Sequence, residues 1–109
     1  MVFDYPNLPE TCIPNFKGGE GNVYVKMFFD GMNRVMRGRL PVGSTIGMHT
    51  HETSSEIFYV LSGTAVFIID GERETVQAGQ CHYCPKGHTH TCLNGGDEDL
   101  IIFAVVPEQ

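Results

Sequence analysis

Short runs of β-branched and aromatic residues recur along the chain from residue 23 onward, and turn signals separate them. No stretch between the runs shows a helical pattern of apolar positions. Many short runs at regular spacing are typical of a β-sandwich or a β-barrel, and they argue against a parallel α/β sheet. The pattern predicts an all-β domain with strands near residues 23–29, 34–40, 45–51, 56–62, 65–70, 72–77, 80–84, 89–94 and 99–106.

The turn signals between these strands are also readable. Asp30-Gly31 joins the first two strands, Ser62-Gly63 the fourth and fifth, and Asp70-Gly71 the fifth and sixth, while residues 94–96 (Asn-Gly-Gly) precede the last. An Asp-Gly pair between two strand-like runs is a strong hairpin signal. We expect the clearest hairpin at Asp70-Gly71.

The first 22 residues differ from the rest in composition. Pro6, Pro9 and Pro14 are followed by a glycine-rich run over residues 17–22, which disfavours both helix and long strand. We expect an irregular N-terminal arm over residues 1–22, laid across a barrel of residues 23–107. With 109 residues and 41% hydrophobic content, the chain can supply one packed core, so we expect residues 1–109 to form a single domain.

Alternation along the strand 56–62 predicts which side chains face inward. If Glu56 points into the domain, Phe58 and Val60 do so as well. The intervening residues then face the other way: Ile57, Tyr59 and Leu61. The next run, residues 65–69, has no polar face, so alternation does not predict which of its side chains face inward.

Charge and composition exclude several partners. Seven Lys and Arg against 13 Asp and Glu give a net charge of -6, which disfavours nucleic acid and anionic membrane surfaces. The N-terminus lacks the features of a secretion signal, and no apolar run approaches the roughly 20 residues of a membrane span. We expect a cytoplasmic protein whose four cysteines are reduced thiols.

The histidines carry the strongest chemical signal. Four of the five lie in the pairs His49-Thr-His51 and His88-Thr-His90, and the fifth is His82. Alternate side chains of a strand share a face, so both histidines of the first pair can reach one metal ion. A nearby carboxylate would add an oxygen ligand, and Glu56 fits this role. The residues alone leave the choice between His88 and His90 open.

The spacing around these histidines resembles the two motifs of the cupin superfamily. The chain contains Gly43-x5-His49-x-His51-x4-Glu56-x6-Gly63, followed by Gly79-x5-Pro85-x-Gly87-x2-His90-x3-Asn94, and all ten specified positions match. The short segment between the motifs, residues 64–78, resembles that of small single-domain bacterial cupins. The resemblance implies a double-stranded β-helix, also called a jelly roll.

The resemblance also implies the metal ligands. They would be His49, His51, Glu56 and His90, with His90 chosen over His88 by the family spacing. Three imidazoles and one carboxylate suit one divalent transition metal ion per chain, whether Fe, Mn, Ni, Zn, Co or Cu. Cupins commonly dimerise through an apolar outer face, so we expect a homodimer.

Further candidates surround this site in the sequence. Tyr59, Tyr83, His82 and His88 are the groups that could move protons near a metal and are the catalytic candidates.

Three arginines of the strand 34–40, Arg34, Arg37 and Arg39, either bind a substrate carboxylate or phosphate or form a solvated, ion-paired face. Alternation puts Arg37 and Arg39 on a common face.

Three of the cysteines lie close to the second motif. Cys81 and Cys84, three apart on a strand, would face opposite sides and act as buried free thiols rather than as a metal or redox pair. Cys92, two residues after His90, is the thiol expected to line the cavity.

Three functions are compatible with such a site. The first is a metal-dependent isomerase, epimerase or lyase acting on a small polar substrate such as a sugar or hydroxy acid. The alternatives are an Fe(II)-dependent dioxygenase and a non-catalytic small-ligand-binding or sensor module.

Overall fold

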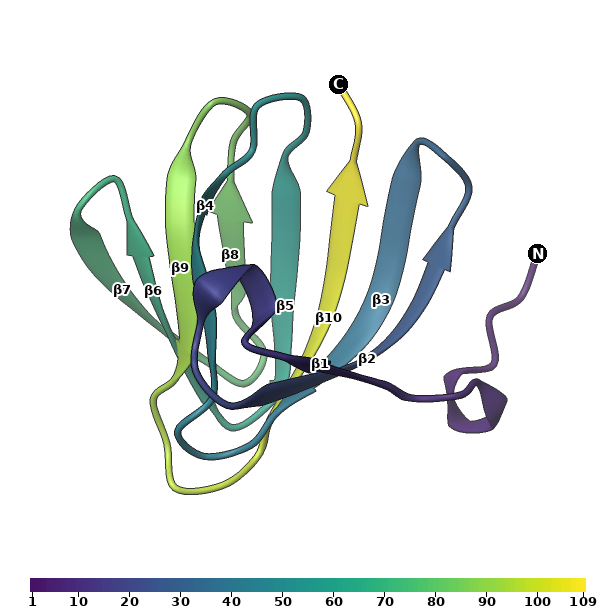
Figure 1. Ribbon diagram of the computed structural model, residues 1–109, viewed down its shortest axis with the longest axis horizontal. Helices are drawn as coiled ribbons and strands as arrows, with labels where there is room; N and C mark the ends of the chain where they lie inside the picture. Colours follow the sequence, from purple (N-terminus) through teal and green to yellow (C-terminus); the bar gives the residue numbers. More distant parts are fainter.

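The computed structural model describes residues 1–109 and places two antiparallel sheets face to face (Figure 1). The six-stranded sheet has the order β1 (Thr11–Pro14), β2 (Asn22–Phe29), β3 (Asn33–Leu40), β10 (Leu100–Pro107), β5 (Glu56–Ser62), β8 (Cys81–Cys84). The four-stranded sheet has the order β4 (Thr45–Thr50), β9 (Thr89–Asn94), β6 (Thr64–Ile69), β7 (Glu72–Gln77). The all-β jelly roll is therefore confirmed, and the chain crosses repeatedly between the sheets.

The N-terminal arm is more ordered than its composition suggests. It contains β1, which pairs antiparallel with β2, and two short 3-10 turns at Tyr5–Asn7 (η1) and Phe16–Gly18 (η2). β1 lies at the edge of its sheet, where a proline costs no hydrogen bond to a second neighbour, so Pro14 is tolerated there. Neither 3-10 turn, nor any other helix, is long and apolar enough to cross a membrane.

Two of the expected turns differ in what they connect. Asp70 and Gly71 form the expected two-residue hairpin between β6 and β7, both with positive φ (49° and 82°), as a type I′ turn requires. Gly63 instead carries the chain from one sheet to the other. Its φ is 88°, and an added Cβ would lie 2.8 Å from the carbonyl oxygen of Asp99. Glycine is needed there for this crossing.

The core fills the space between the sheets. Phe58 and Val60 of β5 are 2% and 0% exposed, whereas Ile57, Tyr59 and Leu61 are about 40% exposed, between 39% and 44%. The predicted alternation of β5 is therefore confirmed. In β6, which could not be sorted from sequence, Ala65, Val66 and Phe67 are all buried, because Gly95 packs over Val66 on the outer side.

Candidate metal centre

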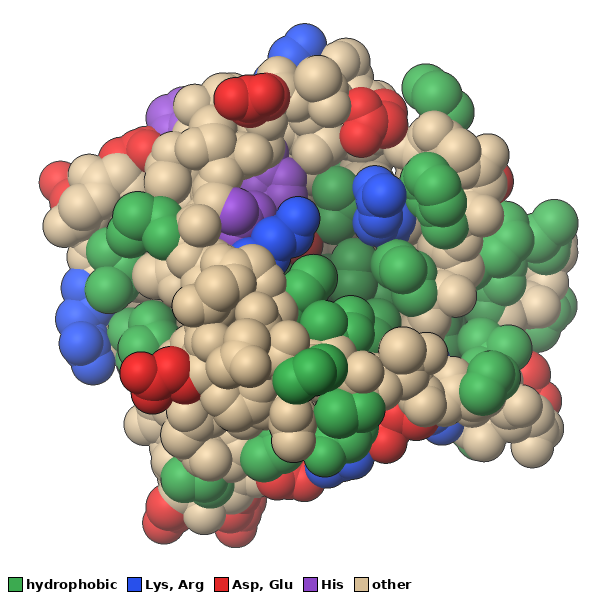
Figure 2. Space-filling model, viewed as in Figure 1, with side chains coloured by type: hydrophobic (Ala, Val, Ile, Leu, Met, Phe, Trp, Pro, Cys, Tyr) green, Lys and Arg blue, Asp and Glu red, His purple; other side chains and the backbone are tan.

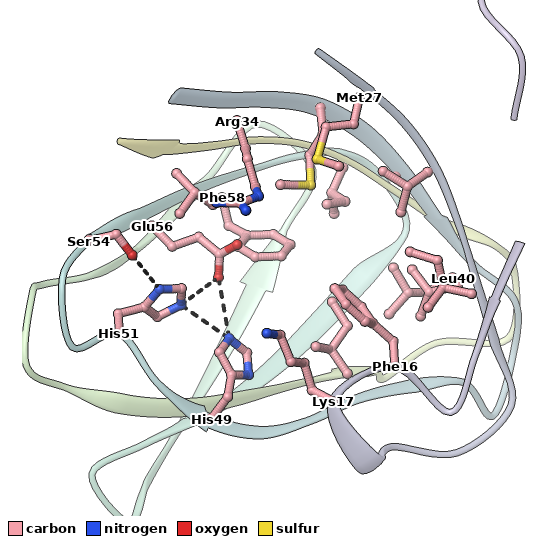
Figure 3. A pocket seen from close by; sticks show the side chains of 18 of the residues that line it. Phe16, Lys17, Met27, Arg34, Leu40, His49, His51, Ser54, Glu56 and Phe58 are labelled. Atoms are coloured by element: carbon pink, nitrogen blue, oxygen red, sulfur yellow. Dashed lines mark hydrogen bonds and ion pairs between the residues drawn. The ribbon is translucent and has the colours of Figure 1, made fainter. Parts of the chain in front are cut away.

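Four side chains from three strands and one loop converge inside one end of the barrel. His49 on β4 lies directly opposite His90 on β9 in the strand register. His51 follows the end of β4, and Glu56 begins β5. The ligand atoms of these four residues all lie within 4.8 Å of one another. Figure 3 shows His49, His51 and Glu56 pointing toward one another.

The distances within this cluster suit a metal ion. The three Nε2 atoms of His49, His51 and His90 are 3.0–3.2 Å apart, and Glu56 Oε1 is 2.9 Å from His90, 3.2 Å from His51 and 3.9 Å from His49. Metal–nitrogen bonds of about 2.1 Å at right angles would place two ligand atoms about 3.0 Å apart. The spacing of the imidazoles therefore fits a shared ion, and the donor set suits a transition metal.

Glu56 is held as a carboxylate in this cluster. Burial by itself raises the pKa of Glu56, but hydrogen bonds to His49, His51 and His90 outweigh it and hold the pKa well below its usual range. A buried carboxylate in contact with three imidazoles provides a negative charge for a cation.

The opposite ring nitrogen of each histidine also has a partner. His49 Nδ1 is 2.8 Å from the carbonyl oxygen of Gly47, and His51 Nδ1 is 3.0 Å from Ser54 Oγ. His90 Nδ1 is 3.1 Å from His82 Nε2. When Nδ1 donates its hydrogen to such a partner, Nε2 presents a lone pair, which is the form that binds a metal. All three imidazoles are thus oriented with Nε2 toward the shared centre.

A cavity of about 510 Å³ opens in front of the cluster. Figure 2 shows the histidines at the base of a hollow with basic and hydrophobic side chains around it. The apolar wall includes Phe16, Met27, Leu40 and Phe58. Such a cavity has room for a small molecule beside the four ligands, with one apolar and one polar side.

Two cations reach into this cavity from opposite walls (Figure 3). Arg34 extends from β3, and its guanidinium stacks on the Phe29 ring at 4.2 Å. Lys17 extends from η2, where it adopts a left-handed conformation with φ 56°. The arm packs tightly on β4, since a Cβ on Gly47 would overlap the carbonyl oxygen of Lys17. Lys17 is not evident as a site residue from the sequence, because it lies in a glycine-rich run with no strand pattern.

Comparison with known proteins agrees with this architecture. A family model described as a cupin domain matches residues 36–106. The chain belongs to the cupin family.

Relatives of this cupin include an oxalate-binding protein from Thermotoga maritima, 33% identical over 97% of this chain and 93% of that protein. The crystal structure of a predicted oxalate decarboxylase from Thermotoga maritima superimposes with a TM-score of 0.93 at 31% identity, covering both chains fully. KdgF from Halomonas shares the fold at 16% identity, with a TM-score of 0.81 over 100% of this chain and 94% of the other.

The cupin barrel does not bring the two candidate tyrosines to the cluster. Tyr59 and Tyr83 are 43% and 54% exposed, on the outer side of the six-stranded sheet. The pairing of β5 with β8 explains their position. In this pairing Ile57 lies opposite Tyr83, and Glu56 lies opposite Cys84. Because Glu56 points inward, Ile57 next to it points out, and so do Tyr59 two residues further on and Tyr83 opposite Ile57.

The two remaining candidate histidines have different surroundings. His82 is 1% exposed and contacts His90 directly. Burial lowers the pKa of His82, and its hydrogen bond to Glu74 only partly offsets this effect. His88 precedes β9 in a turn, is half-exposed and hydrogen-bonds to Asp70. The structure therefore brings His82, but not His88, to the cluster.

The other arginines lie on the outer side of the sheet. Arg39 forms an ion pair with Glu10 at 2.9 Å, and its guanidinium lies 3.6 Å from Asp99. Arg37 is exposed on the same side. Their shared face is confirmed, and it is an ion-paired surface outside the cavity.

The positions of the cysteines on β8 and β9 determine which of them are buried. Cys81 is exposed and Cys84 is buried, so the pair diverges as expected, although only one thiol is buried. Burial raises the pKa of Cys84 to about 11. Cys92 belongs to the hydrophobic core rather than to the cavity wall, because it lies opposite Phe67 in the middle of the small sheet. The expectation that Cys92 lines the cavity is wrong.

Proposed function

We propose that this cupin binds one divalent transition metal ion through His49, His51, Glu56 and His90 and holds a small carboxylate anion beside it. The observation that carries the proposal is the presence of Lys17 and Arg34 in the same cavity as the four ligands. The chain as a whole has a net charge of -6, so two cations gathered in one cavity indicate an anionic ligand.

The relatives support a dicarboxylate as the ligand. The Thermotoga relative is named for binding oxalate, and it covers almost the whole chain. Oxalate offers one carboxylate that can face the metal ligands and a second that can face a guanidinium. Arg34 can bind a carboxylate with two parallel hydrogen bonds, and Lys17 can act as a point charge. The apolar wall near Phe58 would exclude water from the ion pairs between the ligand and these two cations.

Among the reactions considered from sequence, we favour a lyase acting on such an anion. A bound divalent ion would supply Lewis acidity toward a carboxylate oxygen. Lys17 carries protons that it could donate to a product carbanion or carboxylate, and Arg34 would hold the substrate in place. Tyr59 and Tyr83, the tyrosines that an isomerase or epimerase could have used for proton transfer, lie outside the barrel.

Calorimetry on the metal-loaded protein tests the proposal. We expect oxalate to bind more tightly than acetate, and glucose not to bind. Lys17→Met is expected to weaken oxalate binding by about 10-fold, the loss of one charge-assisted hydrogen bond. Arg73→Met, which removes an exposed charge on β7, serves as the control. Equal affinity for oxalate and acetate, or an unchanged Lys17→Met variant, would contradict the carboxylate site.

Assays of oxalate turnover in the same samples distinguish a lyase, a dioxygenase and a binding module. Release of carbon dioxide from oxalate would support the lyase. Oxygen uptake with Fe(II) would instead favour the dioxygenase, and tight binding without turnover would favour a binding module.

We also propose that the cupin is a homodimer. Ile57, Tyr59, Leu61 and Tyr83 form a half-exposed apolar patch on the outer face of β5 and β8. A second copy covering this patch would remove it from water. Light scattering is expected to give twice the chain mass of 12.1 kDa, and Tyr59→Glu to give the monomer. A wild-type monomer would contradict the proposal.

A further inference from the structure

His82 and Glu74 continue the metal cluster outward to the protein surface. His82 on β8 is 1% exposed, and its Nε2 lies 3.1 Å from His90 Nδ1. Its other nitrogen, Nδ1, lies 2.8 Å from Glu74 Oε1 on β7. Glu74 is half-exposed. The three residues therefore form one continuous chain of hydrogen bonds from a buried ligand to a solvated carboxylate, and the chain bridges the two sheets.

The positions of the hydrogens follow from the two ends of this chain. A carboxylate only accepts, so His82 Nδ1 must carry the hydrogen that it donates to Glu74. Neutral His82 then has a lone pair on Nε2 and accepts from His90 Nδ1. A hydrogen on His90 Nδ1 leaves Nε2 with its lone pair toward the cluster, whereas the Glu56 carboxylate, 2.9 Å from Nε2, would draw the hydrogen to that nitrogen. Each step of the chain agrees with the form of His90 that binds a metal.

Aromatic packing fixes the orientation of the rings. The His82 ring stacks on Phe67, with centroids 3.8 Å apart and planes 13° apart. The planes of His82 and His90 are 18° apart. His82 therefore has little freedom to rotate, and its Nε2 stays directed at His90.

The other two histidine ligands lack such a carboxylate. His49 donates to the carbonyl oxygen of Gly47 and His51 to the hydroxyl oxygen of Ser54, both neutral acceptors. Only His90 is linked, through a second imidazole, to a full negative charge. A carboxylate behind a histidine fixes its tautomer and makes it a stronger ligand.

We propose that Glu74 and His82 act as a positioning pair that holds the hydrogen of His90 on Nδ1 and thereby sets the affinity of the centre for its metal. This inference rests on the metal binding proposed above. Neither residue would touch the metal or the substrate.

Metal affinity of matched variants tests the pair. We expect Glu74→Gln to weaken binding of Zn²⁺ and Mn²⁺, measured by competition with a chelator, by about 10-fold. His82→Phe, which keeps the ring stacked on Phe67, is expected to weaken it by about 10- to 100-fold. Glu72→Gln, two residues away on β7, makes the same change of charge on an exposed side chain and should leave the affinity unchanged.

Nitrogen-15 NMR of the metal-free protein reports which nitrogen of His90 carries the hydrogen. A purely structural role of His82 would leave this tautomer unchanged. At mildly alkaline pH the wild type and Glu72→Gln should show His90 with its hydrogen on Nδ1, whereas His82→Phe should show a mixture of the two tautomers. Unchanged tautomer in His82→Phe, or wild-type affinity in Glu74→Gln, would overturn the pairing. If the wild type binds no metal but shows the expected tautomer, the proposed function fails while the hydrogen-bonded chain stands.

Discussion

The two faces of the six-stranded sheet share the same strands but carry different chemistry. On β3 the inner face presents Arg34 to the cavity, whereas the outer face presents Arg37 and Arg39 to solvent and to acidic partners. On β5 the inner face presents Glu56 to the histidines, whereas the outer face presents Tyr59. The arginines of β3 are thus separated by strand alternation alone, which makes neighbouring positions on one strand natural controls for one another.

The largest difference is expected between His88, in the turn before β9, and His90, on β9. His90→Ala should lower metal affinity by more than about 100-fold, because substitutions behind a ligand already cost about 10–100-fold. His88→Ala, outside the barrel and paired with Asp70, should bind metal as the wild type does. Metal content after purification without added metal measures both. Loss of metal from His88→Ala alone would reverse the ligand assignment.

Adjacent isoleucines of β10 compare the faces in terms of stability. Ile102 is 2% exposed and belongs to the core, whereas Ile101 is partly exposed on the outer face. Ile102→Ala should lower the free energy of unfolding by about 2–5 kcal/mol, because it removes packed methyl groups and leaves a cavity. Ile101→Ala should cost about 1 kcal/mol or less.

Urea unfolding at two protein concentrations measures this difference and separates any contribution from a dimer. Equal losses of stability in the two isoleucine variants would mean that the outer face is as well packed as the core.

The arginines of β3 compare the faces in terms of binding. Arg34→Gln should weaken oxalate binding by about 10- to 100-fold, because a hydrogen bond to a charged group contributes about 1.5–3 kcal/mol. Arg37→Gln should bind oxalate with wild-type affinity, since its side chain lies on the outer face. Calorimetry on the metal-loaded proteins compares them. An equal loss in both variants would indicate a general effect of charge instead of a site.

The smallest effect is expected from the titration of His82. Its folded-state pKa is lowered by burial, so the unfolded chain takes up a proton first as the pH falls below the ordinary value of 6.5. Neutral His82 therefore contributes its full share of the folding free energy above pH 6.5. This share decreases as the pH falls from 6.5 to the lower pKa that His82 has in the folded protein. Glu56 also has a lowered pKa, but its window begins only below 4.5.

Thermal unfolding of the metal-free protein between pH 7 and pH 5 isolates the contribution of His82. Between pH 7 and pH 5, the melting temperature of His82→Phe should fall by less than that of the wild type. A steeper loss in the variant would show that His82 is not kept neutral by the fold.

Much of the fold followed from local patterns in the sequence. The strand alternation of β5 and the Asp70-Gly71 hairpin were readable because period-2 burial and positive φ depend on a few neighbouring residues. The strand β1 was missed because it lies between Pro9 and a glycine-rich run and ends at Pro14, and an edge strand tolerates a proline that local rules treat as a break.

For the candidate site, the sequence by itself determined the identity and spacing of the four residues that could hold a metal. Only the tertiary structure decided what surrounds them. Lys17 enters the cavity because the arm folds back onto β4, and His82 reaches His90 because β8 and β9 lie in opposite sheets that face each other. Both contacts depend on how distant segments pack. Alternation along a strand predicts which way a side chain points, but it does not predict what lies opposite.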